Sequence, residues 1–137
     1  MSDASISLDT SCVMRLLVFQ PPDSYRMASR FLMEQRAAGV SIHVGDLVLA
    51  EAYFALQTFY QLTKADALAT LAKFSRYGGV TVTPHARAVL ALPNLASAKP
   101  GFVDRLIHGE SQASGRTFVT CEKAAGKLPG TVVLTTS

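Results

Sequence analysis

Acidic side chains at two strand ends are the first candidates for chemistry in this sequence. Asp9 closely follows a predicted strand, Ile6–Leu8, and Glu122 follows another, Thr117–Thr120. In open sheets of parallel strands, ligands bind at the carboxyl ends of the strands, so both acids stand where a ligand site is expected. Each position also has a structural explanation, because an acid there can cap the helix that follows or favour its first turn.

Two further carboxylates lie on predicted helices. Glu51 is the only charged residue in the stretch LVLAEAYFAL, and its apolar neighbours predict that it is buried. A buried carboxylate must pair with Arg or Lys, take up a proton or bind a metal, so a structural ion pair is an alternative to a ligand site. Asp104 falls in the first turn of a predicted helix, Phe102 to about Ala113, where the helix dipole alone would favour an acid.

Taken together, Asp9, Glu51, Asp104 and Glu122 indicate a metal site. Side chains at strand ends and on crossover helices can converge on one crevice of a parallel sheet. Like charges crowded there would raise one another's pKa values unless a divalent cation neutralised them. Oxygen ligands suit Mg²⁺ or Mn²⁺, and the absence of paired His and Cys ligands disfavours zinc. Such a site is typical of phosphodiester hydrolysis, in which a metal activates water and stabilises charge on the phosphate.

The elements that must hold these residues alternate between strands and helices. With 137 residues, 49% of them hydrophobic and 17% charged, the chain suits one folded domain, residues 1–137, and not a disordered segment. Short apolar runs separated by segments of helical period predict an α/β fold with a mainly parallel sheet. The predicted strands are Ile6–Leu8, Ile42–Val44, Val80–Val82, Thr117–Thr120 and Val132–Leu134; the predicted helices are Cys12–Phe19, Tyr25–Ala38, one capped by Asp46, one opened by Thr63, one opened by Thr83 and Pro84, and Phe102–Ala113, with a helical turn at Leu128–Gly130.

Composition narrows the class of protein. The net charge of +3 allows a nucleic-acid partner without requiring one. No secretory signal is recognisable, and the longest nearly apolar run, Leu47 to Leu56, is too short to span a bilayer, so a soluble cytoplasmic protein is expected. Cys12 and Cys121 lack disulfide-scaffold or zinc spacing and are expected to be small, reduced core residues. A P-loop is absent, which disfavours nucleotide triphosphate chemistry.

The segments around the four acids resemble the PIN-domain nucleases, in particular the VapC-type toxins of bacterial and archaeal toxin–antitoxin pairs. ISLDTSCVMRLL is similar to the family's opening strand, Asp-Thr-Asn/Ser motif and apolar helix, VLAEAYFAL to its second motif and FVDRLI to its third. TCEKAAGKLPG resembles its last motif, Thr-Phe-Asp-Lys/Arg followed by a Leu-Pro-Gly turn. The resemblance covers essentially the whole chain, but Glu122 stands where Asp is usual and Cys121 where Phe is usual.

The resemblance implies a three-layer α/β/α sandwich around a mainly parallel sheet of four or five strands. It further implies a metal-dependent endoribonuclease that leaves a 5′-phosphate and a 3′-hydroxyl. In it Asp9, Glu51 and Asp104 would bind the principal Mg²⁺ or Mn²⁺. Glu122, one methylene longer than Asp, would complete or loosen a second metal position.

The resemblance also implies supporting residues and partners. Ser11 and Thr120 would orient carboxylates or water as hydrogen-bond donors. The implied partners are an RNA substrate, a cognate VapB-like antitoxin that blocks the site, and a second copy of the chain in a homodimer. Aromatic residues around Phe54 and Phe59 give an independent hint of a partner surface, although a helix buried on two sides explains them equally well.

The competing hypothesis is a degenerate, non-catalytic PIN-like module that binds protein or RNA. In that case the change at Glu122 has cost the chain its second metal. Metal binding distinguishes the two hypotheses. His108, four residues after Asp104, could reach the same crevice, but a surface or capping histidine is the more usual finding.

Overall fold

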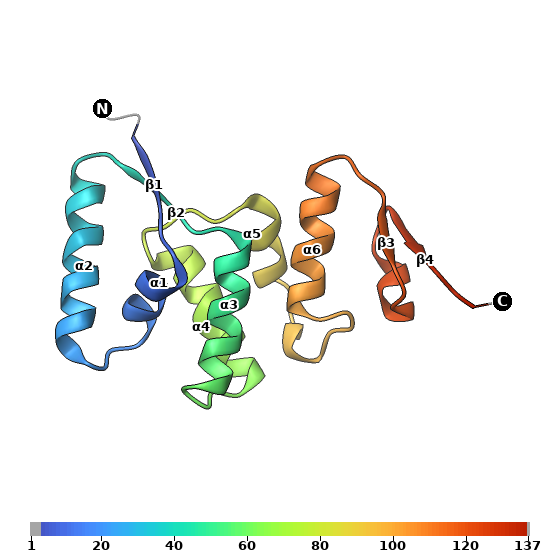
Figure 1. The fold of residues 1–137 in the computed structure, drawn as a ribbon, viewed down its shortest axis with the longest axis horizontal. Helices are drawn as coiled ribbons and strands as arrows, with labels where there is room; N and C mark the ends of the chain where they lie inside the picture. Colours follow the sequence, from blue (N-terminus) through green and yellow to red (C-terminus); the bar gives the residue numbers. More distant parts are fainter. Residues whose placement is uncertain (1–3, 137) are drawn as a thin grey trace. The chain divides into compact units, whose positions relative to one another are not determined.

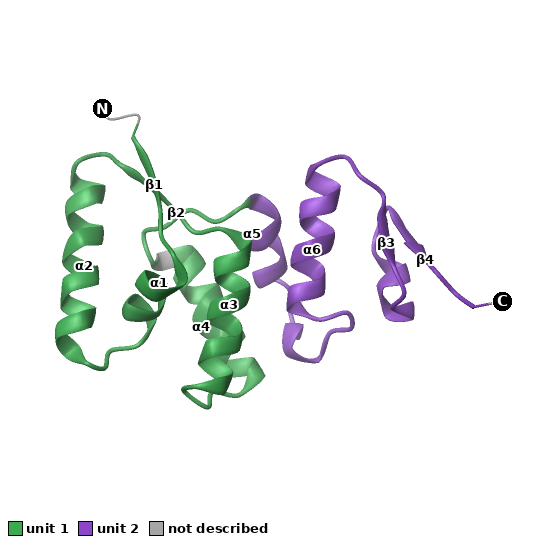
Figure 2. Ribbon diagram, viewed as in Figure 1, with its two compact units in different colours: residues 1–83 green, residues 84–137 purple. Residues whose placement is uncertain are grey.

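A computed structural model describes residues 4–136 of the chain. The chain divides into two compact units, Met1–Thr83 and Pro84–Ser137, which are coloured separately in Figure 2. Asp9 and Glu51 belong to the first unit, and Asp104 and Glu122 belong to the second. Compact units can be parts of one domain, so a single domain over residues 1–137 stays a prediction.

Helices and a small parallel sheet build the first unit (Figure 1). Its elements are β1 (Ser5–Ser7), α1 (Thr10–Leu17), α2 (Pro22–Ala37), β2 (Ser41–His43), α3 (Asp46–Thr58) and α4 (Lys64–Tyr77). α1 packs on α2 and on α3, and α3 packs on α4. The largest fully buried side chains, Val13, Val44, Leu49 and Leu71, come from these elements and the end of β2, so the core joins α1, α3 and α4.

The strands of the first unit pair in parallel. β1 pairs with β2, with Ile6 opposite Ile42, and Thr81 joins β2 through a parallel bridge to His43. Because α1 and α2 carry the chain back between β1 and β2, both strands end at the same edge of the sheet. Asp9 follows β1 at this edge. The fold thus places the first candidate acid where the sequence predicts it.

Local signals explain several helix boundaries in this unit. α2 begins at Pro22, because the fixed φ of proline suits the first helical turn and its missing N–H is not needed there. Gly39 has a φ of 78° just after α2, the left-handed conformation predicted for a glycine that ends a helix. The Thr63 side chain accepts a hydrogen bond of 3.0 Å from the Asp66 backbone N–H, which confirms the predicted cap of α4.

The start of α3 differs from the prediction. Gly45 occupies the cap position, and Asp46 is the first helical residue. The Asp46 carboxylate instead accepts a 2.7 Å hydrogen bond from the Thr83 hydroxyl. The predicted strand Val80–Val82 contributes only the bridge at Thr81. Asp46 therefore ties α3 to the end of this third parallel segment.

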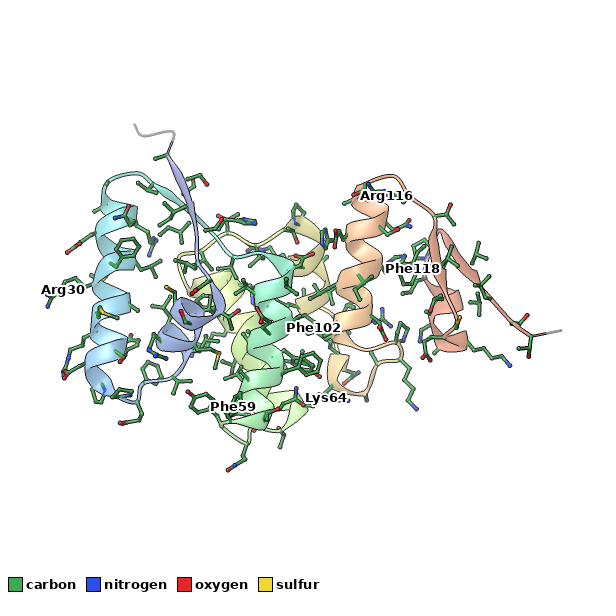
Figure 3. All side chains as sticks on the ribbon, in the orientation of Figure 1. Arg30, Phe59, Lys64, Phe102, Arg116 and Phe118 are labelled. Carbon is green, nitrogen blue, oxygen red and sulfur yellow. The ribbon has the colours of Figure 1, made fainter. Side chains whose placement is uncertain are left out.

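The second unit contains α5 (Pro84–Leu90), η1 (Leu95–Ser97), α6 (Phe102–Ala113), β3 (Phe118–Thr120), η2 (Lys123–Lys127) and β4 (Thr131–Val133). α5 packs on α6, and β3 pairs in parallel with β4. His108 is buried, its Nε2 donates to the Pro129 carbonyl oxygen at 2.7 Å, and its ring meets the labelled Phe118 edge-on at 5.5 Å (Figure 3). His108 therefore has a buried structural role in place of the surface one expected.

The α/β class with parallel strands is confirmed, while the four- or five-stranded sheet stays a prediction. Across residues 4–136 the strands form two two-stranded sheets, one in each unit. The helical turn predicted at Leu128–Gly130 is wrong, because η2 ends at Lys127 and Leu128 is extended with a ψ of 140°. A residue before proline avoids the helical region, and Pro129 follows. None of the helices in the described range combines the length and apolar character needed to cross a membrane.

Two leucines on α3 provide a matched test of the first unit. Leu49 is 0% exposed and Leu47 is 75% exposed. We expect Leu49→Ala to lower the free energy of unfolding by about 2–5 kcal/mol, because it removes apolar contacts and leaves a cavity. Leu47→Ala should change it by less than about 0.5 kcal/mol. Urea unfolding of the intact chain measures both, and equal effects would contradict the burial pattern of α3.

Candidate metal-binding site

The candidate site begins at the turn between β1 and α1. Asp9 has extended backbone angles, φ −88° and ψ 177°, and is the N-cap of α1. Its Oδ1 accepts hydrogen bonds from the Ser11 hydroxyl at 2.6 Å and from the Cys12 backbone N–H at 3.0 Å. The capping explanation for Asp9 is thus confirmed, since its carboxylate satisfies a donor that the helix leaves open. Both of these hydrogen bonds use Oδ1.

The hydrogen bonds at Asp9 also favour the charged form of its side chain. They hold the pKa of Asp9 below its usual value of 3.8, the Ser11 hydroxyl most strongly and the Cys12 backbone N–H next. Burial acts in the opposite direction and more weakly. The pKa of the Cys12 thiol is raised, first by burial and then by the charge of Asp9, so Cys12 is a neutral thiol at pH 7. The turn therefore presents one carboxylate and no thiolate.

Glu51 reaches the same turn from α3. Its Oε1 accepts a 2.7 Å hydrogen bond from the hydroxyl of Thr10, the residue that follows Asp9. The contact joins residues 41 positions apart in the sequence. Two hydroxyl groups of this turn therefore each bind a carboxylate: Ser11 donates to Asp9 within the turn, and Thr10 donates to Glu51 from α3.

The prediction that Glu51 is buried is wrong, because its side chain is exposed. α3 is apolar on more than one face, and the face that packs inward carries Leu49 and Leu56. Glu51 lies on the other face with Leu47 and Phe54, which are 75% and 54% exposed. The apolar neighbours of Glu51 in the sequence thus surround it on the surface and not in the core.

The donors at this turn fit a hard divalent cation. Asp9, Glu51, Thr10 and Ser11 offer only oxygen atoms, which suits Mg²⁺ or Mn²⁺. Mg²⁺ is commonly held by one or two carboxylates and completes its shell with water and substrate phosphates, so two carboxylates are enough to begin such a site. Within neither unit do three or more His, Cys, Asp or Glu side chains of the described residues gather closely enough to hold a metal. The convergence of all four acids stays a prediction.

The other two candidate acids lie in the second unit. Asp104 is exposed in the first turn of α6, where it offsets the positive end of the helix dipole. Glu122 is exposed at the N-cap position of η2, without a side-chain capping bond. The backbone N–H of Glu122 donates to the Thr120 hydroxyl oxygen at 3.0 Å. Thr120 therefore shapes the turn that carries Glu122, and its role toward a carboxylate or water stays a prediction.

A groove of about 450 Å³ lies beside the turn, between α1 and α2. Ser11 and Cys12 line one end of it, and Arg15 and Phe31 line it further along the two helices. Cys12 and Cys121 are both free and exposed, so the expectation that they are core residues is wrong. Cys12 lies on an exposed face of α1, and Cys121 is exposed directly after β3.

Thr10 is the residue that the sequence analysis missed. Asp9, Thr10 and Ser11 form a run of three oxygen-bearing side chains at a predicted strand end, which was a signal for the turn. The partner of Thr10 was not visible in the sequence, because Glu51 belongs to another helix.

Comparison with known proteins adds no assignment to this site. No protein-family model matches the chain, and no curated protein matches it. The interpretation of the turn therefore depends on its residues and their geometry.

The Ser11 hydroxyl gives a direct test of the electrostatics. Ser11→Ala removes the donor that lowers the pKa of Asp9 most, so that pKa should rise toward 3.8. Because a lowered carboxyl pKa contributes stability that is lost as pH falls from the unfolded-state value through the folded-state value, the acid-induced loss of stability that comes from Asp9 should be smaller in Ser11→Ala. Carboxyl-carbon NMR titration measures the pKa. Ser97→Ala, which removes a hydroxyl bonded only to the Asn94 carbonyl oxygen, should leave it unchanged.

Proposed function

We propose that this chain is a metal-dependent endoribonuclease, the toxin of a VapBC-type toxin–antitoxin pair. The observation that carries the proposal is the 2.7 Å hydrogen bond from Thr10 to Glu51, which brings Glu51 to the residue that follows Asp9 at the start of α1. Exposed carboxylates at the carboxyl end of a parallel strand are suited to a cation that also binds a substrate phosphate.

The residues of the turn have distinct roles in this proposal. Asp9 and Glu51 would hold Mg²⁺ or Mn²⁺, while Ser11 and Thr10 each donate a hydrogen bond to one of these carboxylates. The Ser11 hydroxyl lowers the pKa of Asp9 and so favours its ionised form, and the exposure of both carboxylates leaves room for water and RNA. When bound, the metal supplies a Lewis acid that lowers the pKa of water and stabilises charge on the phosphate.

We propose the same family's sandwich fold for this chain, and Asp104 and Glu122 as its remaining metal ligands. The proposed fold is a PIN-like three-layer sandwich with a mainly parallel sheet of four or five strands. The parallel direction of both strand pairs, β1 with β2 and β3 with β4, is in keeping with it. Asp104 then joins the principal metal, and Glu122 completes or loosens a second position. Both side chains are exposed.

The proposed partners are an RNA substrate, a VapB-like antitoxin and a second copy of the chain, in the cytoplasm. The net charge of +3 favours a polyanion such as RNA. Exposed aromatic side chains on α3 and just after it favour protein partners: Phe54 is 54% exposed and Phe59, labelled in Figure 3, is 75% exposed. These exposures support the partner-surface explanation of the aromatic residues over burial on two sides.

Cleavage of RNA tests the proposal. Purified chain free of any antitoxin should cut total RNA into discrete fragments with Mg²⁺ or Mn²⁺ and not with EDTA. Asp9→Asn and Glu51→Gln should each lower the rate by at least about 100-fold, because each weakens the binding of an ion that contributes several kcal/mol to the transition state. Gel analysis of 5′-phosphate and 3′-hydroxyl products identifies the chemistry.

The control for this experiment is Glu34→Gln, which neutralises an exposed acid on α2. It should cleave like the unchanged chain. Cleavage that survives EDTA or Asp9→Asn would contradict the metal mechanism. No cleavage together with no Mn²⁺ binding would favour the non-catalytic binding module.

A further inference from the structure

Thr10 stands outside the proposed ligand set, yet its side chain touches that set. Its hydroxyl donates to Oε1 of Glu51 at 2.7 Å. We propose that Thr10 is a positioning residue of the metal site, whose hydroxyl fixes the Glu51 carboxylate beside the turn that carries Asp9, where the two carboxylates would hold the cation together. This inference rests on the proposed function and names a residue on which metal affinity depends.

An exposed glutamate needs such an anchor. The side chain of Glu51 has several rotatable bonds, and ordering a side chain of this kind costs up to about 2 kcal/mol of conformational entropy. Glu51 is exposed, so packing does not hold its carboxylate in place. A hydrogen bond formed before the metal arrives reduces the ordering that binding must bring about.

Thr10 is a stiff donor at a fixed place. It is the first residue of α1, directly after the N-cap Asp9, and it is partly buried. A β-branched side chain has few accessible χ1 rotamers, so the backbone of the helix start fixes where the hydroxyl lies. α1 also packs on α3, with Val13 and Leu49 fully buried. The position of Thr10 relative to the backbone of α3 is therefore set by the core.

The turn between β1 and α1 then orients both proposed metal ligands in the same way, with a hydroxyl group that donates to each carboxylate. Ser11 donates to Oδ1 of Asp9, and Thr10 donates to Oε1 of Glu51. Each hydroxyl donates to one oxygen of its carboxylate, which limits the orientations that the carboxylate can take. Groups that orient metal ligands in this way commonly change metal affinity by 10- to 100-fold when they are removed.

A purely structural tie between α1 and α3 would have a different signature. The Thr10–Glu51 hydrogen bond lies at the exposed surface, where water can replace either partner. Its loss should therefore change stability little, while it should change metal affinity substantially. Metal binding and thermal unfolding measured on the same variants separate the two roles.

The experiment compares Thr10→Val, which removes the hydroxyl, with Thr10→Ser, which keeps it. Mn²⁺ binding to the full chain is measured by calorimetry. Thr10→Val should weaken the Kd by about tenfold, Thr10→Ser should stay within about twofold of the unchanged chain, and the Tm of both should stay close to it. In a Glu51→Gln background, Thr10→Val should cause no further weakening, because its partner has already been removed.

Thr70→Val is the matched control, since the Thr70 hydroxyl donates to the Asp66 carbonyl oxygen at 2.8 Å on α4. It should leave the Kd unchanged. Equal Kd values for Thr10→Val and the unchanged chain would overturn the positioning role and leave the proposed metal site standing. Equal losses in Thr10→Val and Thr10→Ser would also overturn it, because the hydroxyl would then not be the cause.

A readout without metal separates failure of this inference from failure of the proposed function. The ¹³C resonance of the Glu51 carboxyl, assigned through Glu51→Gln, should move in Thr10→Val and keep its position in Thr10→Ser. Absence of Mn²⁺ binding by the unchanged chain overturns the metal site and with it the positioning role, whatever the resonance does. If the unchanged chain binds Mn²⁺ but the Glu51 resonance does not move in Thr10→Val, only the Thr10–Glu51 hydrogen bond is overturned.

Discussion

The turn that joins β1 to α1 is the constraint on which the candidate site depends. Asp9 caps the helix, Thr10 donates to Glu51, and Ser11 donates to Asp9. All three roles require the helix to begin at Thr10. A start one residue later would rotate the side chains by about 100° around the helix axis and carry the hydroxyls away from both carboxylates. A local feature of the backbone, the position of one helix start, thus decides whether a cation site can form.

Exposure explains how two neighbouring carboxylates can be accommodated without a cation. Water screens the interaction between exposed charges far more than a dry interior does. Asp9 and Glu51 are exposed, so repulsion between them is strongly screened. Hydrogen bonds from Ser11 and Thr10 offset part of it. The fold of this unit therefore does not depend on a metal, unlike that of small zinc domains, in which metal binding supplies the folding free energy.

Features that depend on sequence neighbours were predictable, and features that depend on packing were not. The caps at Asp9 and Thr63 and the left-handed Gly39 follow from a few adjacent residues, and all three are confirmed. The exposure of Glu51 was not predictable, because α3 is apolar on more than one face and its pattern does not indicate which face packs inward. The bond from Thr10 to Glu51 spans 41 residues and depends on how α1 packs on α3, so short motifs carry no sign of it. The number of strands in a sheet was likewise not predictable, because strands of three residues carry little sequence signal and their pairing depends on long-range contacts.

The surroundings of Glu51 constrain what can cover the candidate site. Leu47 and Phe54 flank it on the exposed face of α3, so a partner that covers this face gains about 25 cal/mol for each Å² of apolar surface it buries. The same partner would remove the Glu51 and Asp9 carboxylates from water, which costs several kcal/mol for each ion unless opposite charge is supplied. A favourable complex must therefore bring a cation, either a divalent metal with RNA phosphates or a Lys or Arg side chain of a protein. In the proposed toxin, RNA with its metal and a basic antitoxin segment would satisfy the same two carboxylates, and each would exclude the other.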